Sequence, residues 1–176
     1  MRVSSGAAEE KAIMNAAYAL CAAIRTAPKA CGIDNLETVI ITGEEKDALA
    51  AEMRKLGKEP NCEFFTRDAG NVDESHAVVL VGAKENTRGL GKRCRLCRFD
   101  DCAACSAVGA QCVYPALDLG IALGSAAALA ADLRIDNRIF FTAGKAAASM
   151  GLLGDNKLIM GIPLSVSGKS PFFDRG

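Results

Sequence analysis

The sequence predicts an α/β (α+β) fold, with a mixed sheet flanked by helices, in a single domain that covers residues 1–176. Segments with apolar residues at helical spacing alternate with short segments rich in β-branched residues, as in a sheet with helices on its faces. Residues 76–83, HAVVLVGA, are almost continuously apolar, which is typical of a strand buried on both faces. A polar, cysteine-rich stretch at 89–112 breaks the alternation and is interpreted as an insert.

N-terminal of the insert, turn and capping signals separate the expected elements. Pro and Gly mark a loop after the first helix, and Thr42 and Glu45 have the spacing of a capping box that opens the second helix. Gly57 is expected to end that helix. The elements, in order, are a helix at 7–26, a loop at 27–35, a strand at 36–42, a helix at 42–57, a short or edge strand at 63–66, and a strand at 76–83.

C-terminal of the insert, regular structure is expected to resume at Pro115, a residue that the first turn of a helix accepts. Small residues along this helix, among them Gly120 and Gly124, would let another helix approach closely. The expected elements are a helix from 115 to about 133, a strand at 138–142, a short helix at 144–150 and a strand at 157–165.

Composition argues against several classes of partner. The 21 basic and 21 acidic residues give a net charge of zero, so no overall field attracts nucleic acid or an anionic membrane surface. Glu9 and Glu10 stand where a secretory signal would need its apolar segment. The longest apolar run, residues 119–131, is too short to span a bilayer. We therefore expect a cytoplasmic protein that uses neither nucleic acid nor a membrane.

Five cysteines in the insert, at positions 94, 97, 102, 105 and 112, indicate a metal site. Their spacing is C-x2-C-x4-C-x2-C-x6-C, and in the cytoplasm clustered cysteines favour metal binding over disulfides. Structural zinc usually takes two C-x2-C pairs separated by a longer connection, and the single histidine makes a mixed Cys/His site improbable. Zinc nevertheless stays an alternative. Two of the other cysteines suit buried structural thiols: Cys21 and Cys31.

Close cysteine spacing favours an iron–sulfur cluster, because four thiolates must reach a compact group from one loop. The preferred ligands for a [4Fe–4S] cluster are Cys94, Cys97, Cys102 and Cys112. Cys105 is then a spare thiol or a replacement for one of the four ligands.

Basic residues crowd the same segment, and two readings of them are open. Cationic groups near the sulfurs would raise the reduction potential of a negatively charged cluster. The same residues could instead form a solvated loop surface, and two acidic neighbours partly offset their charge. The residues are Arg88, Lys92, Arg93, Arg95 and Arg98.

Nearly the whole chain resembles the uncharacterised ferredoxin-domain-containing protein family of anaerobic bacteria and archaea. The resemblance lies in CRLCRFDDCAACSAVGAQC, in DLGIALGSAAALAADLRIDNRIFFTAGKAA and in MGIPLSVSGKSPFFDR. The cysteine part is also similar to the C-x2-C-G-x3-C motif of corrinoid iron–sulfur subunits, with Arg98 in place of the motif's glycine. The resemblance implies a ferredoxin-like cluster and leaves the reaction open.

A more remote resemblance, at the level of the fold, is to flavin-dependent nitroreductases. It lies in the RTAP loop, the strand ETVIITG, the Ala-rich helix and GIPLS. It implies FMN bound at a homodimer interface, although the N-terminal flavin signature and the Gln-Pro-Trp motif of those enzymes are missing. The residues it assigns to flavin are Arg25 and Asn35 near the loop, with Lys169 and Arg175 as phosphate partners.

A homodimer is also expected from residues 119–131, because a helix that is apolar nearly all round must be covered on every side.

Three functions follow from these patterns. The first is an iron–sulfur electron-transfer protein whose redox partner is unknown. The second is an FMN-dependent oxidoreductase, and the third is a zinc-stapled structural module.

Overall fold

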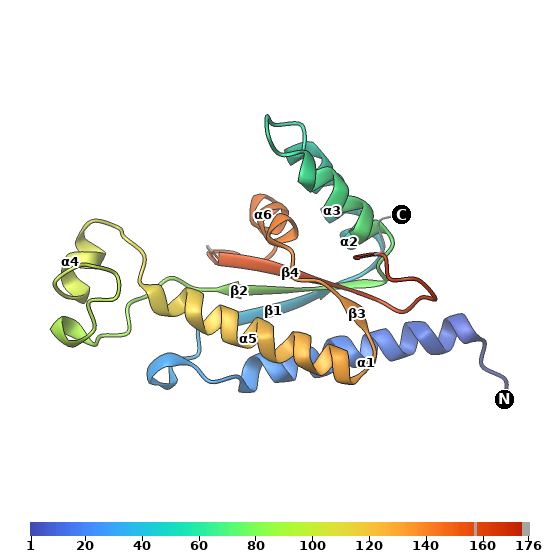
Figure 1. Ribbon diagram of the computed structural model, residues 1–176, viewed down its shortest axis with the longest axis horizontal. Coiled ribbons are helices and arrows are strands. Elements are labelled where there is room, and N and C mark those ends of the chain that lie inside the picture. Colours follow the sequence, from blue (N-terminus) through green and yellow to red (C-terminus); the bar gives the residue numbers. More distant parts are fainter. Residues whose placement is uncertain (157, 174–176) are drawn as a thin grey trace.

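The computed structural model describes residues 1–156 and 158–173, which form a sheet with helices on both faces (Figure 1). The helices are α1 (Ser5–Thr26), α2 (Gly43–Leu56), α3 (Glu63–Asp73), α4 (Cys102–Ala107), α5 (Val113–Asp132) and α6 (Phe141–Ser149), with 3-10 turns η1 (Ala30–Gly32) and η2 (Gly91–Arg93). The strands are β1 (Leu36–Ile41), β2 (Ala77–Ala83), β3 (Asp136–Asn137) and β4 (Leu158–Ser165).

The sheet has the strand order β1-β2-β4-β3, and every described pairing is antiparallel. The predicted α+β class, with helices on the faces of a sheet, is confirmed. The sheet is antiparallel throughout its described strands, however, and not mixed as predicted. All seven residues of β2 are buried, as the apolar run at 76–83 indicated.

Two apolar layers hold the helices to the sheet. Figure 1 shows α1 and α5 on one face, and α2, α3 and α6 on the other. Alternate residues of β2 point to opposite faces, so Val79 and Val81 pack with α1 and α5 while Val78 and Leu80 pack with α2 and α6. At Gly144 of α6 the approach is so close that a Cβ would lie 1.7 Å from the carbonyl oxygen of Ile159 in β4.

The short strand predicted at 63–66 is wrong, because these residues begin α3. The buried Phe65, Ala69 and Val72 recur at helical spacing, and this longer period outweighs the strand preference of the EFF sequence. Thr42 does occupy the N-cap of α2, but its side chain makes no capping hydrogen bond.

The strand predicted at 138–142 is also largely wrong. Pairing with β4 is confined to Asp136–Asn137 and to one isolated bridge between Phe140 and Gly161. Phe141 already begins α6, three residues before the predicted start of this helix. The strand predicted at 157–165 is confirmed from Leu158 onward, and residue 157 lies outside the described residues.

Helix α5 packs against α1 and β2 on one side and leaves an apolar stripe uncovered on the other. Leu117 is 47% exposed and Ile121 is 49% exposed. Gly120 and Gly124 lie on the same side, where an added Cβ would meet no atom within 4 Å. By length and composition α5 is the one described helix that could cross a membrane, a property that it shares with core helices of globular proteins.

Residues 84–112 connect β2 to α5 and contain η2 and α4. In Figure 1 they form the yellow-green lobe that projects beyond one end of the sheet. We call this segment the cysteine lobe. Only two of its residues, Arg88 and Cys105, are buried, so the sheet positions the lobe through its two ends and a few specific contacts.

Candidate functional site

Two arginines with left-handed backbone conformations shape the cysteine lobe. Arg95 has φ 50° and Arg98 has φ 67°, and the amide of Arg98 donates to the carbonyl of Arg95 at 2.9 Å. Such values favour glycine, which is the residue that the related cluster motif carries at position 98. Arg98 therefore adopts a backbone conformation that glycine would adopt without strain. Asp101 then caps α4 by accepting from the amide of Ala104 at 2.9 Å.

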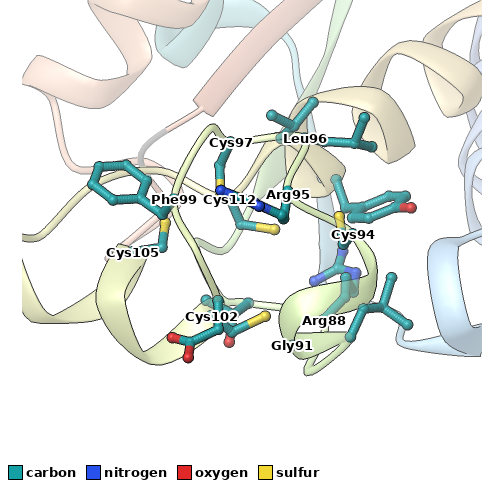
Figure 2. A pocket seen from close by; sticks show the side chains of 15 residues that line it. Arg88, Gly91, Cys94, Arg95, Leu96, Cys97, Phe99, Cys102, Cys105 and Cys112 are labelled. Carbon is teal, nitrogen blue, oxygen red and sulfur yellow. The ribbon is translucent and has the colours of Figure 1, made fainter.

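The five cysteines of the lobe line one cavity. Figure 2 shows their five sulfur atoms distributed around the inside of the loop. All five are free thiols. The folded chain thus brings together Cys94, Cys97, Cys102 and Cys112, the ligands preferred from the sequence, with Cys105, the alternative.

Cys105 differs from the other four in burial and bonding. Its side chain is fully buried, whereas the others are half-buried, and its thiol donates to the carbonyl of Ala110 at 3.3 Å. Burial raises the pKa of the Cys105 thiol, and its hydrogen bond with Cys97 raises it further. Its full burial and its hydrogen bond to Ala110 set Cys105 apart from the four half-buried thiols and favour it as the spare thiol.

The thiols are spread around the cavity. Within residues 1–156 and 158–173, no three Cys, His, Asp or Glu side chains converge as ligands of a single metal ion. A tetrahedral zinc ion with Zn–S bonds of about 2.3 Å would hold its thiolates about 3.8 Å apart. A cluster of several irons keeps its four thiolates farther apart, because each thiolate binds a different iron.

Arg88 forms one wall of this cavity, and its side chain is only 1% exposed. Its guanidinium donates to Asp118 Oδ2 of α5 at 2.5 Å and also to Asn86 Oδ1. The other carboxylate oxygen of Asp118 accepts from the amide of Ala30 in η1 at 2.9 Å. The buried ion pair therefore ties the cysteine lobe to α5 and to the loop after α1.

Tyr114, in the first turn of α5, also lines the cavity. Burial raises the pKa of its phenol, and the neighbouring Cys94 raises it further through charge and a side-chain hydrogen bond. Cys31 of η1 also contributes to this shift, so it lies near the same tyrosine. The expectation that Cys31 is a buried structural thiol is wrong, because this residue is exposed and has φ 57°.

Sequence reasoning missed the roles of Asp118 and Tyr114. A signal for Asp118 was present, because a carboxylate between Leu117 and Leu119 in an apolar helix is expected to have a buried cationic partner. Nothing in the local pattern pointed to Arg88 as that partner, since it lies 30 residues away in a segment with no regular period.

The residues assigned to flavin lie at opposite ends of the sheet. Arg25 pairs with Asp34 at 2.5 Å, and Asn35 donates to Asn86 at 2.5 Å, both near the cysteine lobe. Lys169 follows β4 at the other end of the sheet, about 20 Å away along a six-residue strand. Arg175 lies outside the described residues.

Lys169 lines an open groove near the ends of β2 and β4 that meet there, together with His76 and Ser165. The Ser165 hydroxyl is buried and has no hydrogen-bond partner within the described residues. Three carboxylates also line the groove, which disfavours a phosphate-binding surface: Glu9, Asp73 and Glu74.

Comparison with known proteins gives one family and one fold. Residues 108–175 match the family described as uncharacterized proteins containing a ferredoxin domain. An uncharacterized protein from Archaeoglobus fulgidus is 41% identical over 168 residues, which are 91% of this chain and 90% of that protein.

Among solved structures, a nitroreductase with bound FMN from Desulfitobacterium hafniense has a TM-score of 0.59 at 14% identity, covering 96% of this chain and 81% of that chain. A nitroreductase family protein from Clostridium novyi has the same TM-score at 12% identity, covering 97% and 78%. The nitroreductase-like fold predicted from the sequence is confirmed.

Proposed function

We propose that this chain, which belongs to the family of uncharacterized proteins containing a ferredoxin domain, is a cytoplasmic electron-transfer protein with one [4Fe–4S] cluster. The observation that carries the proposal is the single cavity lined by all five thiols of the lobe. Cys94, Cys97, Cys102 and Cys112 are the ligands, and Cys105 is the spare thiol.

When bound, such a cluster supplies one-electron redox chemistry. The chain's own residues would hold and shield it. Four thiolates would ligate the irons, while Phe99 and Tyr114 line the cavity and limit access of water. The buried Arg88 would place a hydrogen-bond donor beside a group that is anionic in its common oxidation states.

The outside of the lobe suits a redox partner with an acidic surface. Lys92, Arg93 and Arg98 are exposed, and no ion pair occupies them within the described residues. Leu96 is 54% exposed beside them. Cations around an apolar residue attract and orient an acidic partner close to the cluster, and they do so less at high salt.

Purification without oxygen tests the proposal. The protein should be brown and contain about four irons per chain, as a [4Fe–4S] cluster requires. Stoichiometric zinc with no iron, after anaerobic reconstitution with both metals, would instead support the structural zinc module and refute the redox function.

Single serine variants test the ligand set. Cys97→Ser should lose the iron, whereas Cys105→Ser should keep it, because Cys105 donates as a thiol to Ala110. Cys62→Ser, outside the lobe, is the matched control and should retain full iron content. If Cys105→Ser loses iron and Cys112→Ser retains it, the ligands are instead Cys94, Cys97, Cys102 and Cys105.

The second candidate function is that of an FMN-dependent oxidoreductase. It is favoured by the nitroreductase-like fold. Because Arg25 and Asn35 lie far from Lys169 in one chain, a flavin that contacts all three would need residues from two chains. FMN that binds only the folded protein must raise its melting temperature. An unchanged melting temperature and unquenched flavin fluorescence would exclude this function.

A further inference from the structure

Arg88 is the most buried of the charged residues that line the cysteine cavity. It is 5% exposed overall, whereas Asp101 is half-buried and Arg95 is exposed. A charged side chain in such a position must have its polar atoms satisfied, because burial removes the hydrogen bonds that water would supply. The partners of the Arg88 guanidinium can therefore be accounted for nitrogen by nitrogen.

Two of the three guanidinium nitrogens have partners. One terminal nitrogen donates to Asp118 Oδ2 and the other donates to Asn86 Oδ1. The third nitrogen, Nε, is buried and has no hydrogen-bond partner within the described residues. The oxygens of Asp118 and Asn86 accept only from the terminal nitrogens, so the hydrogen on Nε has no acceptor.

The cavity offers few acceptors for this donor. Besides Arg88, the cavity is lined by apolar residues such as Leu90 and Val113, by the five cysteines and by the oxygen-bearing side chains of Thr87, Asp101 and Tyr114. Asp101 already accepts from the amide of Ala104, and a neutral thiol accepts only weakly. A thiolate or a cluster sulfide is a far better acceptor, since a hydrogen bond to an anion is about twice as strong as one between neutral groups. We infer that Arg88 Nε donates a hydrogen bond to a sulfur of the cluster site and thereby raises its reduction potential.

This inference rests on the proposed cluster and adds the residue that tunes it. The charge of Arg88 is balanced by Asp118, so the intact pair is formally neutral. The hydrogen bond withdraws electron density from the sulfur and stabilises the reduced, more negative state of the cluster. Arg88 is thus a positioning and tuning residue, with Asp118 holding its guanidinium in place.

Substitutions at Arg88 and at Asp118 should shift the reduction potential in opposite directions, which distinguishes tuning of the potential from structural support. Arg88→Met removes the donor and leaves the Asp118 charge, so reduction should become at least tenfold less favourable, which is 59 mV for a one-electron couple. Asp118→Asn removes the balancing charge and should shift the potential upward. A purely structural role would cause loss of iron in both variants and would not produce shifts of opposite sign.

The double variant Arg88→Met/Asp118→Asn isolates the hydrogen bond. It has the same formal charge as the wild type but lacks Nε, so its potential should stay below that of the wild type. Arg93→Met is the matched control, because Arg93 is an exposed cation of the same lobe whose effect is screened by solvent and salt. Its potential should change by less than half the Arg88→Met shift. Potentials are measured by anaerobic titration with optical and paramagnetic resonance detection.

The outcomes distinguish this inference from the proposed function. Iron-free wild-type protein would refute the cluster itself. Iron-loaded Arg88→Met, or the loaded double variant, with the wild-type potential would refute only the role of Arg88. If Arg88→Met does not retain iron, Arg88→Lys keeps the charge opposite Asp118 and lacks Nε. The reduction potential of Arg88→Lys should be lower than that of the wild type. A potential equal to that of the wild type would overturn the inference.

Discussion

The sheet with its helices and the cysteine lobe belong to one chain, but they are held together differently. Every residue of β2 is buried, and two apolar layers cover the faces of the sheet. In the 29 residues of 84–112, only Arg88 and Cys105 are buried. The core is stabilised by apolar burial, and the lobe has almost none.

Because of this difference, we expect that the lobe needs a ligand to become ordered. Fixing the backbone opposes folding by about 1–2 kcal/mol per residue, and small segments without an apolar core are usually stabilised by disulfides or metals. The thiols of the lobe are free, so a metal site is the available source of stability. Where binding and folding are coupled in this way, removing the metal removes the structure.

The largest expected effect is therefore on the lobe when the metal is removed. In the iron-free protein, or in Cys97→Ser, amide hydrogens of residues 84–112 should exchange as fast as in an unfolded peptide. Those of β2 and β4 should stay protected, because their burial does not involve the lobe. Hydrogen exchange followed by mass spectrometry gives both readings. If the lobe amides stay protected from exchange without metal, the lobe does not need a metal to become ordered.

The next largest expected effect is on dimer formation, which we expect to depend on the sheet and its helices and not on the lobe. We expect a homodimer through the uncovered stripe of α5, where Leu117 and Ile121 flank the small residues Gly120 and Gly124. Large and small residues alternate on one surface, so a second copy can present the complementary shape. Light scattering should give the dimer mass for the wild type and the monomer mass for Ile121→Glu.

The control for this prediction is Ala48→Glu, on an exposed part of α2 away from the stripe, which should remain dimeric. Cys97→Ser should also remain dimeric, since Cys97 is not part of the stripe on α5. A wild-type protein that is monomeric at micromolar concentration would rule out the dimer.

A smaller effect is expected from truncation in the core. Ile162 of β4 is fully buried against α1 and α5, so Ile162→Ala should lower the free energy of unfolding by about 2–5 kcal/mol. Denaturation monitored by circular dichroism measures the change. The iron content of the folded fraction should stay at the wild-type level, because Ile162 does not line the cysteine cavity. Loss of iron at full helix content would contradict the separation of the two regions.

The smallest expected effect is a gain in the stability of the metal-loaded lobe. Arg98→Gly relieves a left-handed backbone that disfavours a side chain by about 1–2 kcal/mol, so the lobe should hold its metal more firmly. A gain of about 1 kcal/mol slows iron loss to a chelator about fivefold. Arg93→Gly, at a position without positive φ, should instead speed iron loss slightly.

The core was largely predictable because its signals are periodic. The apolar run at 76–83 and the helical spacing in α1 require only neighbouring residues to be recognised. The errors occurred where aromatic residues favour strands locally, at 63–66 and 138–142, and where tertiary packing selects helices α3 and α6 instead. Strand direction was also missed, because pairing partners are not encoded in local spacing.

The cysteines that line the cavity could be predicted from the sequence, whereas the residues that hold Arg88 in place could not. The spacing of the cysteines identified the loop, since ligands of a cluster must be close in the chain as well as in space. Asp118, Tyr114 and the loop around Ala30 reach the site only through the fold. Contacts across 30 to 88 residues leave no periodic trace, so the residues that hold Arg88 became visible only in the folded chain.

The central position of β4 has a consequence for how the protein is made. Strand β2 pairs with β1 on one side and with β4 on the other, and β4 is the last described strand to leave the ribosome. Until then the growing chain carries the apolar edge of β2 unpaired, while the cysteine lobe has already been synthesised. Unpaired apolar edges are prone to join other chains. Ribosomes stalled shortly before residue 158 should therefore hold a chain whose lobe thiols can bind metal but whose sheet is still open to aggregation.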